Sequence, residues 1–529
     1  MKKTVKLLTL LLVAIMLVSC FTACNNNDKK PANTDPSGGN STTTTPEEVD
    51  YELPEKVDLG GYVYKAYVRS NAQTGGSTRE DGNPAFYCED FWVDTAPGTE
   101  APKDALTFAV YTRNKEIEND YKVSIRQVNN TINMVQELNR YYQDGERFDL
   151  TIILAKSAAT AATQNLLTDL KSLPSLDLNH EAYDQNSIKE LSMANKLYYL
   201  SGDMNISTLD SVAPTIVNLQ RYEDYAEEIV DHFGDSLYSD VYNLVTEGKW
   251  TMDTMLQIAE IASLDAETSD GNLGASPEDE IGYFQYYESA VYYFYGAGGR
   301  LTQMNESGSP EFVIQNDKNG NLFDYLFENF HPVKRNVKYP CGNSKVRQEN
   351  FITNANTLFT DMTLWDVRKD LYVNSTFEYG LLPNPVKDEG DKYNAVVYFY
   401  NTVHLWAIPS LCNNYSNAQL MMNVMAAYSN LKKEGSTMDG YYTRTLYLTV
   451  AGYNPGARKV MDIIKDSTVY DIALLYDWGG WATELSELWT KRTDNNHGIL
   501  VPQMNSANGA YKQLEETLML FENPGMALD

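Results

Sequence analysis

Cysteine and histidine are scarce in this chain of 529 residues, with five of each. Three cysteines, Cys88, Cys341 and Cys412, lie far apart, so no disulfide framework or zinc spacing is present. The histidines also lack the spacing of a zinc site or a serine triad. The acidic residues 265–279 resemble a calcium loop, but Asp270 stands where an EF-hand requires glycine. We therefore expect no metal ion and no cofactor.

Basic residues are also in deficit. The chain has 42 lysines and arginines against 72 aspartates and glutamates, which gives a net charge of −30. A protein with this charge repels polyanions, because their phosphates would meet a surface of the same sign. The composition therefore argues against a nucleic-acid partner.

Long hydrophobic runs are absent, apart from a short one at the N-terminus. Lys2, Lys3 and Lys6 precede an apolar run at residues 7–18. This run is shorter than the about 20 residues that a membrane-spanning helix needs. The pattern is that of a signal peptide, and we assign residues 1–19 to it.

Two cysteines follow this run closely. Residues 17–19, Leu-Val-Ser, precede Cys20 and resemble the lipobox of bacterial prolipoproteins. Cys24 is the alternative, because the three asparagines after it resemble the start of a mature lipoprotein. Acyl chains such as palmitate on either cysteine would anchor the protein to the outer face of the cell membrane.

A polar segment separates the anchor from the rest of the chain. Residues 25–50 are rich in Asn, Thr, Pro, Gly and Ser, and include four consecutive threonines from Thr42 to Thr45. Such a composition cannot bury a core. We assign residues 20–55 to a lipidated, disordered tether.

Beyond the tether, the sequence alternates between strand and helix patterns. Strands are predicted at residues 61–68, 122–128 and 148–155, with helices from Asp104 to Tyr121, at residues 133–142 and from about Ala158. This alternation predicts an α/β fold with a parallel sheet covered on both faces. Ligands bind at the carboxyl ends of the strands in such sheets, which indicates residues 69–71 and 156–158.

The rest of the chain predicts a second lobe. Within residues 197–206 a strand runs into a short polar break, and a new α/β unit follows from Pro214. Residues 236–339 are predicted to be mostly helical. Pro383 and Pro385 enforce extended backbone at residues 379–385. An aromatic β run at residues 394–408 and further helices follow. A chain that leaves one lobe and returns to it predicts two lobes joined by several hinge strands.

These features together resemble the extracellular solute-binding proteins of ABC importers, in the carbohydrate-binding group that includes maltose-binding protein. The resemblance rests on residues 113–121, 148–170, 196–203, 218–222, 244–255, 282–299 and 379–385. It implies a two-lobed, periplasmic-binding-protein-like type II clamshell. Lobe 1 would comprise residues 56–205 and 386–435, and lobe 2 residues 206–385. Residues 436–529 would form C-terminal helices, mostly on lobe 2.

The resemblance also implies which residues hold a ligand. Sugars are bound by aromatic rings that stack on the pyranose and by polar groups that bond to hydroxyls. In lobe 1 the matching residues are Arg69, Ser70, Asn71, Lys156, Ser157 and Asp203. In lobe 2 they are Tyr286, Tyr287, Glu288, Asp361 and the stacking candidate Trp365, and Trp478 and Trp481 are added because adjacent glycines allow a turn. Trp250 is interpreted as structural, because Thr251 caps the helix that follows it.

The expected function is to capture a carbohydrate, expected to be an oligosaccharide, without changing it chemically, and to deliver it to an ABC permease. We expect a monomer that is not an enzyme. Two alternatives stay open: the same fold binding a peptide or another polar nutrient, or a surface enzyme that degrades glycans. Nothing in the sequence singles out a pair of carboxylates for glycoside hydrolysis.

Overall fold

The computed structural model describes residues 52–69, 90–92, 105–129, 133–265, 273, 278–330, 341–342, 344–399, 403–451, 454–486 and 508–523. The chain divides into two units, residues 1–50 and Tyr51–Asp529, and the second is described below. The predicted signal peptide, both candidate lipidation cysteines, most of the tether and the Asp104 cap lie outside the described residues. In the part that is described, no helix combines the length and the apolar character needed to span a bilayer.

The first sheet has the strand order β12-β3-β1-β2. Its strands are β1 (Tyr62–Val68), β2 (Val123–Asn129), β3 (Leu150–Leu154) and β12 (His404–Ala407). β1 is parallel to β2 and β3, and β12 is antiparallel to β3, so the last strand comes from a distant part of the chain. The first four residues of β3 are buried, as expected for a strand covered on both faces.

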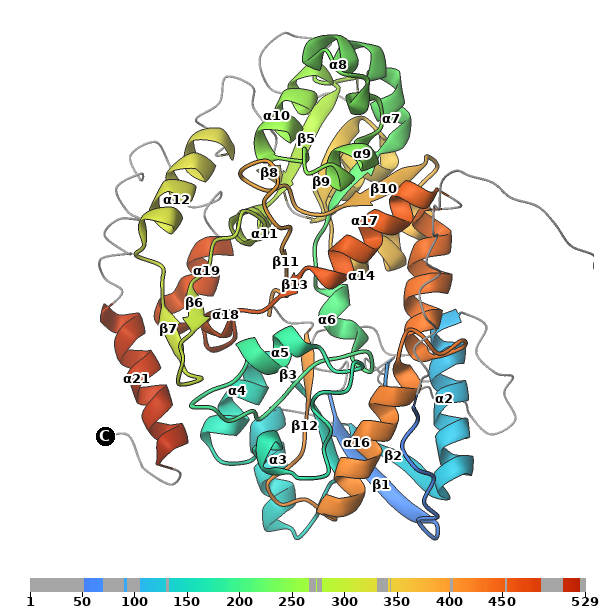
Figure 1. Ribbon diagram of the computed structural model, residues 1–529, viewed down its shortest axis with the longest axis vertical. Coiled ribbons are helices and arrows are strands. Elements are labelled where there is room, and N and C mark those ends of the chain that lie inside the picture. The colour runs from blue at the N-terminus through green and yellow to red at the C-terminus, as the bar shows by residue number, and fades with distance from the viewer. Residues whose placement is uncertain are drawn as a thin grey trace, which may run out of the picture. The chain divides into compact units, whose positions relative to one another are not determined.

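Helices from both ends of the chain cover the first sheet (Figure 1). They are α2 (Ala105–Tyr121), α3 (Met134–Gln143), α4 (Ala155–Thr163) and α16 (Tyr415–Ser429). Asn133 caps α3, because its side chain accepts hydrogen bonds from the amides of Val135 and Gln136. A further short helix α5 (Gln185–Glu190) and a 3-10 turn η2 (Leu170–Ser172) follow α4.

The second sheet has the order β10-β4-β9-β5-β8. Its strands are β4 (Thr215–Asn218), β5 (Ile281–Tyr286), β8 (Cys341–Gly342), β9 (Thr357–Asp361) and β10 (Tyr379–Leu382). β5 is parallel to β8 and β9, whereas β4 is antiparallel to both of its neighbours. The described residues of this unit therefore contain two larger mixed sheets, of four and five strands, besides two sheets of two strands each.

The segments between the second-sheet strands are mostly helical. They are α7 (Leu219–Asp224), α8 (Ala226–Phe233), η3 (Ser236–Ser239), α9 (Val241–Thr246), α10 (Met252–Ile261), α11 (Ser289–Gly296), α12 (Asp317–Phe330), α13 (Ser344–Arg347), η4 (Gln348–Thr353), α14 (Leu364–Asp366), η5 (Val367–Leu371) and α15 (Tyr372–Asn374). A hairpin of β6 (Thr302–Met304) and β7 (Pro310–Phe312) precedes α12. Trp250 is fully buried and Thr251 caps α10, which confirms the structural interpretation of this tryptophan.

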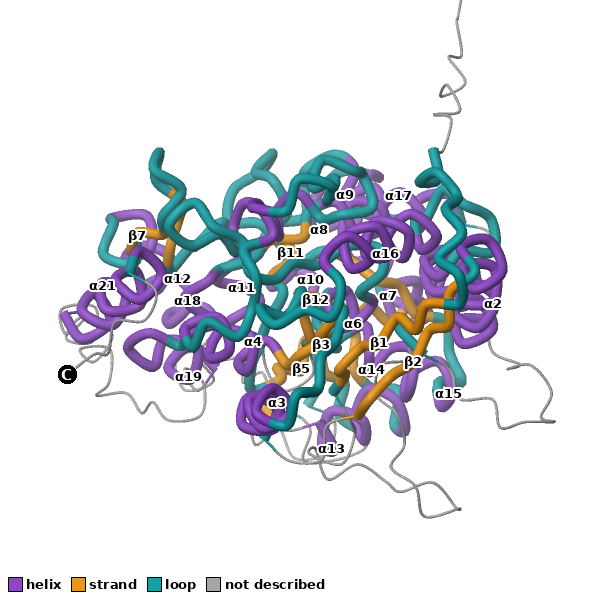
Figure 2. The backbone as a smooth tube through the Cα atoms, turned by 90° about the horizontal axis from the view of Figure 1, so that it is seen from below, coloured by secondary structure: helices purple, strands orange, loops and turns teal. Residues whose placement is uncertain are grey.

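Short segments connect the two sheets. Helix α6 (Ile206–Asp210) carries the chain from the first sheet to the second, and the return passes through β11 (Ala395–Val396), which pairs with β13 (Thr468–Val469). The C-terminal elements are η6 (Asp439–Ala451), α17 (Pro455–Asp466), α18 (Ile472–Tyr476), η7 (Trp478–Gly480), α19 (Trp481–Ser486) and α21 (Asn508–Glu522). Among them, α17 contacts β10 of the second sheet, while α18 contacts α4, a helix that covers the first sheet. Seen from below, α6 lies between α17 on one side and α14 on the other (Figure 2).

The α/β fold class and the first three strands are confirmed, with boundaries that differ by two residues at most. The strand predicted at the start of residues 197–206 is wrong, because only single bridges form there. The polar break predicted after it corresponds to a turn that follows Gly202, before α6 begins at Ile206. The predicted β run at residues 394–408 is split into β11 and β12. The mostly helical prediction for residues 236–339 missed β5, a short aromatic run that is buried and has no helical or alternating period.

Candidate functional site

The predicted residues of the second sheet meet at one edge. β5 and β9 are parallel, with Phe284 opposite Thr360, so both strands end at the same side of the sheet. Tyr286 ends β5, Tyr287 and Glu288 lead into α11, and Asp361 ends β9. We call this the β5–β9 edge. The structure therefore brings together residues that are more than 70 positions apart in the sequence.

Asp361 supports this edge from inside. It is fully buried, and its carboxylate accepts hydrogen bonds from the hydroxyls of Tyr283 (2.7 Å), Ser289 (2.7 Å), Tyr293 (3.1 Å) and Thr215 (3.3 Å). Burial raises the pKa of Asp361, and the four hydroxyls oppose this rise. The sequence predicted a ligand contact here, but the carboxylate has no surface to offer one and instead joins β4, β5, β9 and α11.

Arg347 is a residue of the β5–β9 edge that the sequence did not indicate. It ends α13 and is 1% exposed. Its Nη1 donates to the Asp361 carbonyl (2.7 Å), and its Nη2 pairs with Asp366 Oδ2 (2.6 Å). The guanidinium carbon lies 4.6 Å from the ring centroid of Tyr286. No motif surrounds Arg347, so only the fold shows its place.

Glu288 lies beside this arginine and is partly buried. Burial raises the pKa of Glu288, whereas a hydrogen bond with Tyr286 and the charge of Arg347 lower it. Tyr286 is partly exposed and Tyr287 is 38% exposed, with their rings 6.4 Å apart and nearly parallel. The edge thus offers two aromatic rings and a carboxyl group, the groups that sugar recognition requires.

Trp365 in α14 is partly exposed, but cations already lie against its ring. Arg368 is 4.7 Å and Lys369 is 5.2 Å from the ring centroid. Arg368 also forms a buried ion pair with Asp210 of α6, with Nε 2.9 Å from Oδ1, and Tyr441 donates to the same carboxylate. The tryptophan therefore lies beside the connection between the two sheets.

The predicted residues of the first sheet lie at its own carboxyl edge. Arg69 follows β1, donates its backbone N–H to Ile152 (3.0 Å), and is 1% exposed. Lys156 is exposed and Ser157 is partly exposed, in the first turn of α4 after β3. Ser70 and Asn71 lie outside the described residues.

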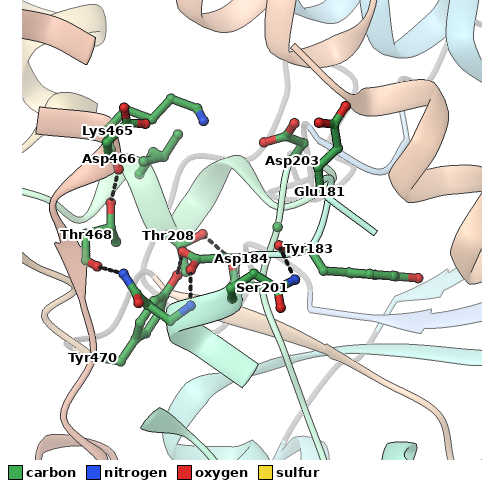
Figure 3. A pocket seen from close by; sticks show the side chains of 14 residues that line it. Glu181, Tyr183, Asp184, Ser201, Asp203, Thr208, Lys465, Asp466, Thr468 and Tyr470 are labelled. Atoms are coloured by element: carbon green, nitrogen blue, oxygen red, sulfur yellow. Dashed lines mark hydrogen bonds between the residues drawn. The ribbon is translucent and has the colours of Figure 1, made fainter. Parts of the chain in front are cut away.

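Asp203 lies elsewhere, in a cavity of about 210 Å³ beside α6. The lining is polar and consists of Glu181, Tyr183, Asp184, Gln185, Asn186, Ser201, Gly202, Asp203, Thr208, Leu209, Lys465, Asp466, Thr468 and Tyr470. Figure 3 shows Lys465 on one side and Asp203 with Glu181 on the other. Burial raises the pKa of Asp203 to about 6, and Lys465 opposes this shift. Hydrogen bonds from Tyr470 to Asp184 (2.7 Å) and from Asn186 to the Thr468 carbonyl (2.8 Å) close one wall.

Trp478 and Trp481 lie in the interior of the C-terminal helices, and each is 3% exposed. Trp478 donates to Thr517 (3.0 Å) and stacks on Tyr476, and Trp481 stacks near Phe323. These rings are surrounded by protein and not brought to either sheet edge. Over the described ranges, no three His, Cys, Asp or Glu side chains are grouped so that they could hold a metal ion.

Comparison with known proteins gives a match in structure but none in sequence. No protein-family model matches the chain, and no curated protein does. A cyclo/maltodextrin-binding protein complexed with maltotetraose is similar in structure, with a TM-score of 0.51, 13% identity, and coverage of 89% of this chain and 100% of that chain. The galacto-N-biose/lacto-N-biose I-binding protein of the ABC transporter from Bifidobacterium longum, in complex with lacto-N-biose, is also similar in structure. The TM-score is 0.51 and the identity 12%, and the match covers 87% of this chain and 99% of that chain. The chain therefore has the two-lobed type II fold of the solute-binding proteins of ABC transporters.

Proposed function

We propose that this protein is the substrate-binding component of an ABC transporter and captures a carbohydrate. The observation that carries the proposal is the β5–β9 edge, where Tyr286, Tyr287 and Glu288 gather in this fold. The two structural relatives are a maltodextrin-binding and a lacto-N-biose-binding protein, which supports the same class of ligand.

The ligand lies, in this proposal, between the carboxyl edges of the two sheets. Tyr286, Tyr287 and Trp365 supply aromatic faces, and Glu288 accepts hydrogen bonds from sugar hydroxyls. From the first sheet, Lys156 and Ser157 are the accessible polar groups. Buried Arg69 and Asp361 would support these residues from within, and Asp203, Trp478 and Trp481 would act on ligand binding only indirectly.

Binding is proposed to close two lobes around the ligand. Lobe 1 comprises residues 56–205 and 386–435, lobe 2 comprises residues 206–385, and the remaining C-terminal helices contact both. A ligand that bonds to both edges stabilises the closed form more than the open form, and so shifts the population toward closure. The closed form then docks on the transmembrane subunits of a permease, which receive the sugar unchanged.

A lipid on Cys20 or Cys24 and the tether at residues 20–55 would hold this monomer at the outer face of the cell membrane. Flexible linkers of this composition let a folded unit move within a limited volume near its anchor. The receptor would therefore stay close to its permease. No cofactor and no nucleic acid take part.

Thermal unfolding with a panel of mono- and oligosaccharides tests the proposal on residues 51–529. A ligand that binds only the folded state at 100 times its Kd adds about 2.7 kcal/mol to the free energy of unfolding. We expect at least one saccharide to raise the unfolding temperature, and chromatography to recover it intact. Shorter products would indicate a glycan-degrading enzyme, and stabilisation by peptides alone would indicate the same fold with a different ligand.

A further inference from the structure

Arg347 is buried at the β5–β9 edge at a considerable energetic cost. Removing a guanidinium from water is unfavourable unless its hydrogen bonds and its charge are matched. Here Nη2 pairs with Asp366 at 2.6 Å, and Nη1 bonds to the Asp361 carbonyl at 2.7 Å. The Asp366 side chain is 26% exposed, so the ion pair joins the interior to the surface.

The third contact of Arg347 is with an aromatic ring. Its guanidinium carbon is 4.6 Å from the centroid of the Tyr286 ring, a distance at which cation–π attraction is effective. Tyr286 remains partly exposed and is followed by exposed Tyr287. Arg347 thus fixes the ring from the protein side and leaves part of it accessible to a ligand.

The backbone around Arg347 is also unusual. The π-helical segment η4 begins directly after it, and the π-helical segment η5 begins directly after its partner Asp366. A second bond between these segments joins Gln348 Nε2 to Asp370 Oδ2 at 2.8 Å. Such π-helical turns are rare and are often found at functional sites. Two of them therefore flank the ion pair that lies beside Tyr286.

We infer that Arg347 is a positioning residue of the ligand site, which holds the Tyr286 ring in place for stacking on a sugar. The inference rests on the proposed function, since it assigns a role within the same site. Arginine suits this role because its planar guanidinium can lie against a ring and form two directed hydrogen bonds at once. Lysine would retain the charge, but it could not lie flat against the ring and form two directed hydrogen bonds at the same time.

A double-mutant cycle with maltotetraose as the probe tests this coupling. We expect Arg347→Met and Tyr286→Ala each to weaken binding about tenfold or more, and the double variant to be little weaker than the worse single variant. Arg347→Lys should also weaken binding, although it keeps the charge. Asp366→Asn is the matched control, because it breaks the ion pair and leaves the guanidinium beside the ring, so it should weaken binding less.

Crystal structures of the ligand-free Arg347→Met and Asp366→Asn variants provide a second measurement. The Tyr286 ring should leave its position in the first variant and keep it in the second. The inference would be overturned if the Tyr286 ring kept its position in Arg347→Met. It would also be overturned if the loss of affinity in the double variant equalled the product of the losses caused by Arg347→Met and Tyr286→Ala singly. If the unmodified protein binds no saccharide, the proposed function fails, and the ring position still decides the role of Arg347. If Arg347→Met does not fold, Arg347→Lys takes its place in both measurements.

Discussion

At the scale of single residues, Asp203 in the cavity beside α6 makes the stability of the folded protein depend on pH. Its pKa of about 6 exceeds the usual value for an aspartate, because the folded protein buries the carboxylate. The folded state therefore binds this proton more tightly than the unfolded state. Stability contributed by the group is lost as pH rises through 6 and regained as pH falls.

We predict that lowering the pH from 7 to 5 adds about 1 kcal/mol to the free energy of unfolding through Asp203. Asp203→Asn should remove this part of the pH dependence, measured by urea unfolding at several pH values. Asp466→Asn is the matched control, because Asp466 lines the same cavity but is exposed. If the free energy of unfolding of Asp203→Asn changed with pH as steeply as that of the unmodified protein, the proton would bind at another group.

The family resemblance indicated part of the proposed site. Tyr286, Tyr287, Glu288 and Trp365 could be proposed because they match segments that hold the sugar in the carbohydrate-binding group. Arg347 could not, since its importance depends on two partners, Asp361 and Asp366, which end β9 and α14. Asp361 was placed in the right region, but its burial by hydroxyls from three other elements is not visible in the sequence.

At the scale of elements, the contact between η6 and α2 depends on a glycine. A Cβ on Gly440 would lie 2.7 Å from the Ala105 carbonyl oxygen and 2.8 Å from the Ala109 Cβ. One of these neighbours belongs to the backbone of α2 and cannot move aside alone. The two elements can therefore approach this closely only without a side chain at position 440.

We predict that Gly440→Ala lowers the free energy of unfolding by about 1–3 kcal/mol, the usual cost of overpacking. Gly320→Ala in α12 is the matched control, because no atom lies within 4 Å of its added Cβ. This control should raise stability by about 0.4–1 kcal/mol through the entropy of the unfolded chain. Denaturant unfolding of both variants measures the difference, and equal effects would contradict the packing argument.

The sequence predicted elements best where the pattern was regular. β1, β2 and β3 alternate with helices, and the predicted strand boundaries hold within two residues. β5 was missed because it is short, mostly apolar or aromatic, and buried in five of its six residues, so that it shows no helical or alternating period. The pairing of β12 with β3 joins residues some 250 positions apart, and local sequence carries no information about such partners.

At the scale of the whole molecule, the proposed closure of the lobes has a measurable consequence. Small-angle X-ray scattering of residues 51–529 should show a smaller radius of gyration after addition of a saturating saccharide, because contacts to both sheet edges favour the compact form. The same scattering measurement on Glu288→Gln, made at the same ligand saturation, is a suitable comparison. A bound ligand without any compaction would contradict the clamshell mechanism.

The origin of β12 has a further consequence for how the molecule forms. The first sheet starts with β1 at Tyr62, yet β12 lies at His404–Ala407, and the second sheet is inserted between them. Contacts between residues so distant in sequence form slowly, because a long loop must close before they are gained. The first sheet therefore cannot be completed until the growing chain has emerged at least as far as β12, and β3 lacks one of its two neighbouring strands until then.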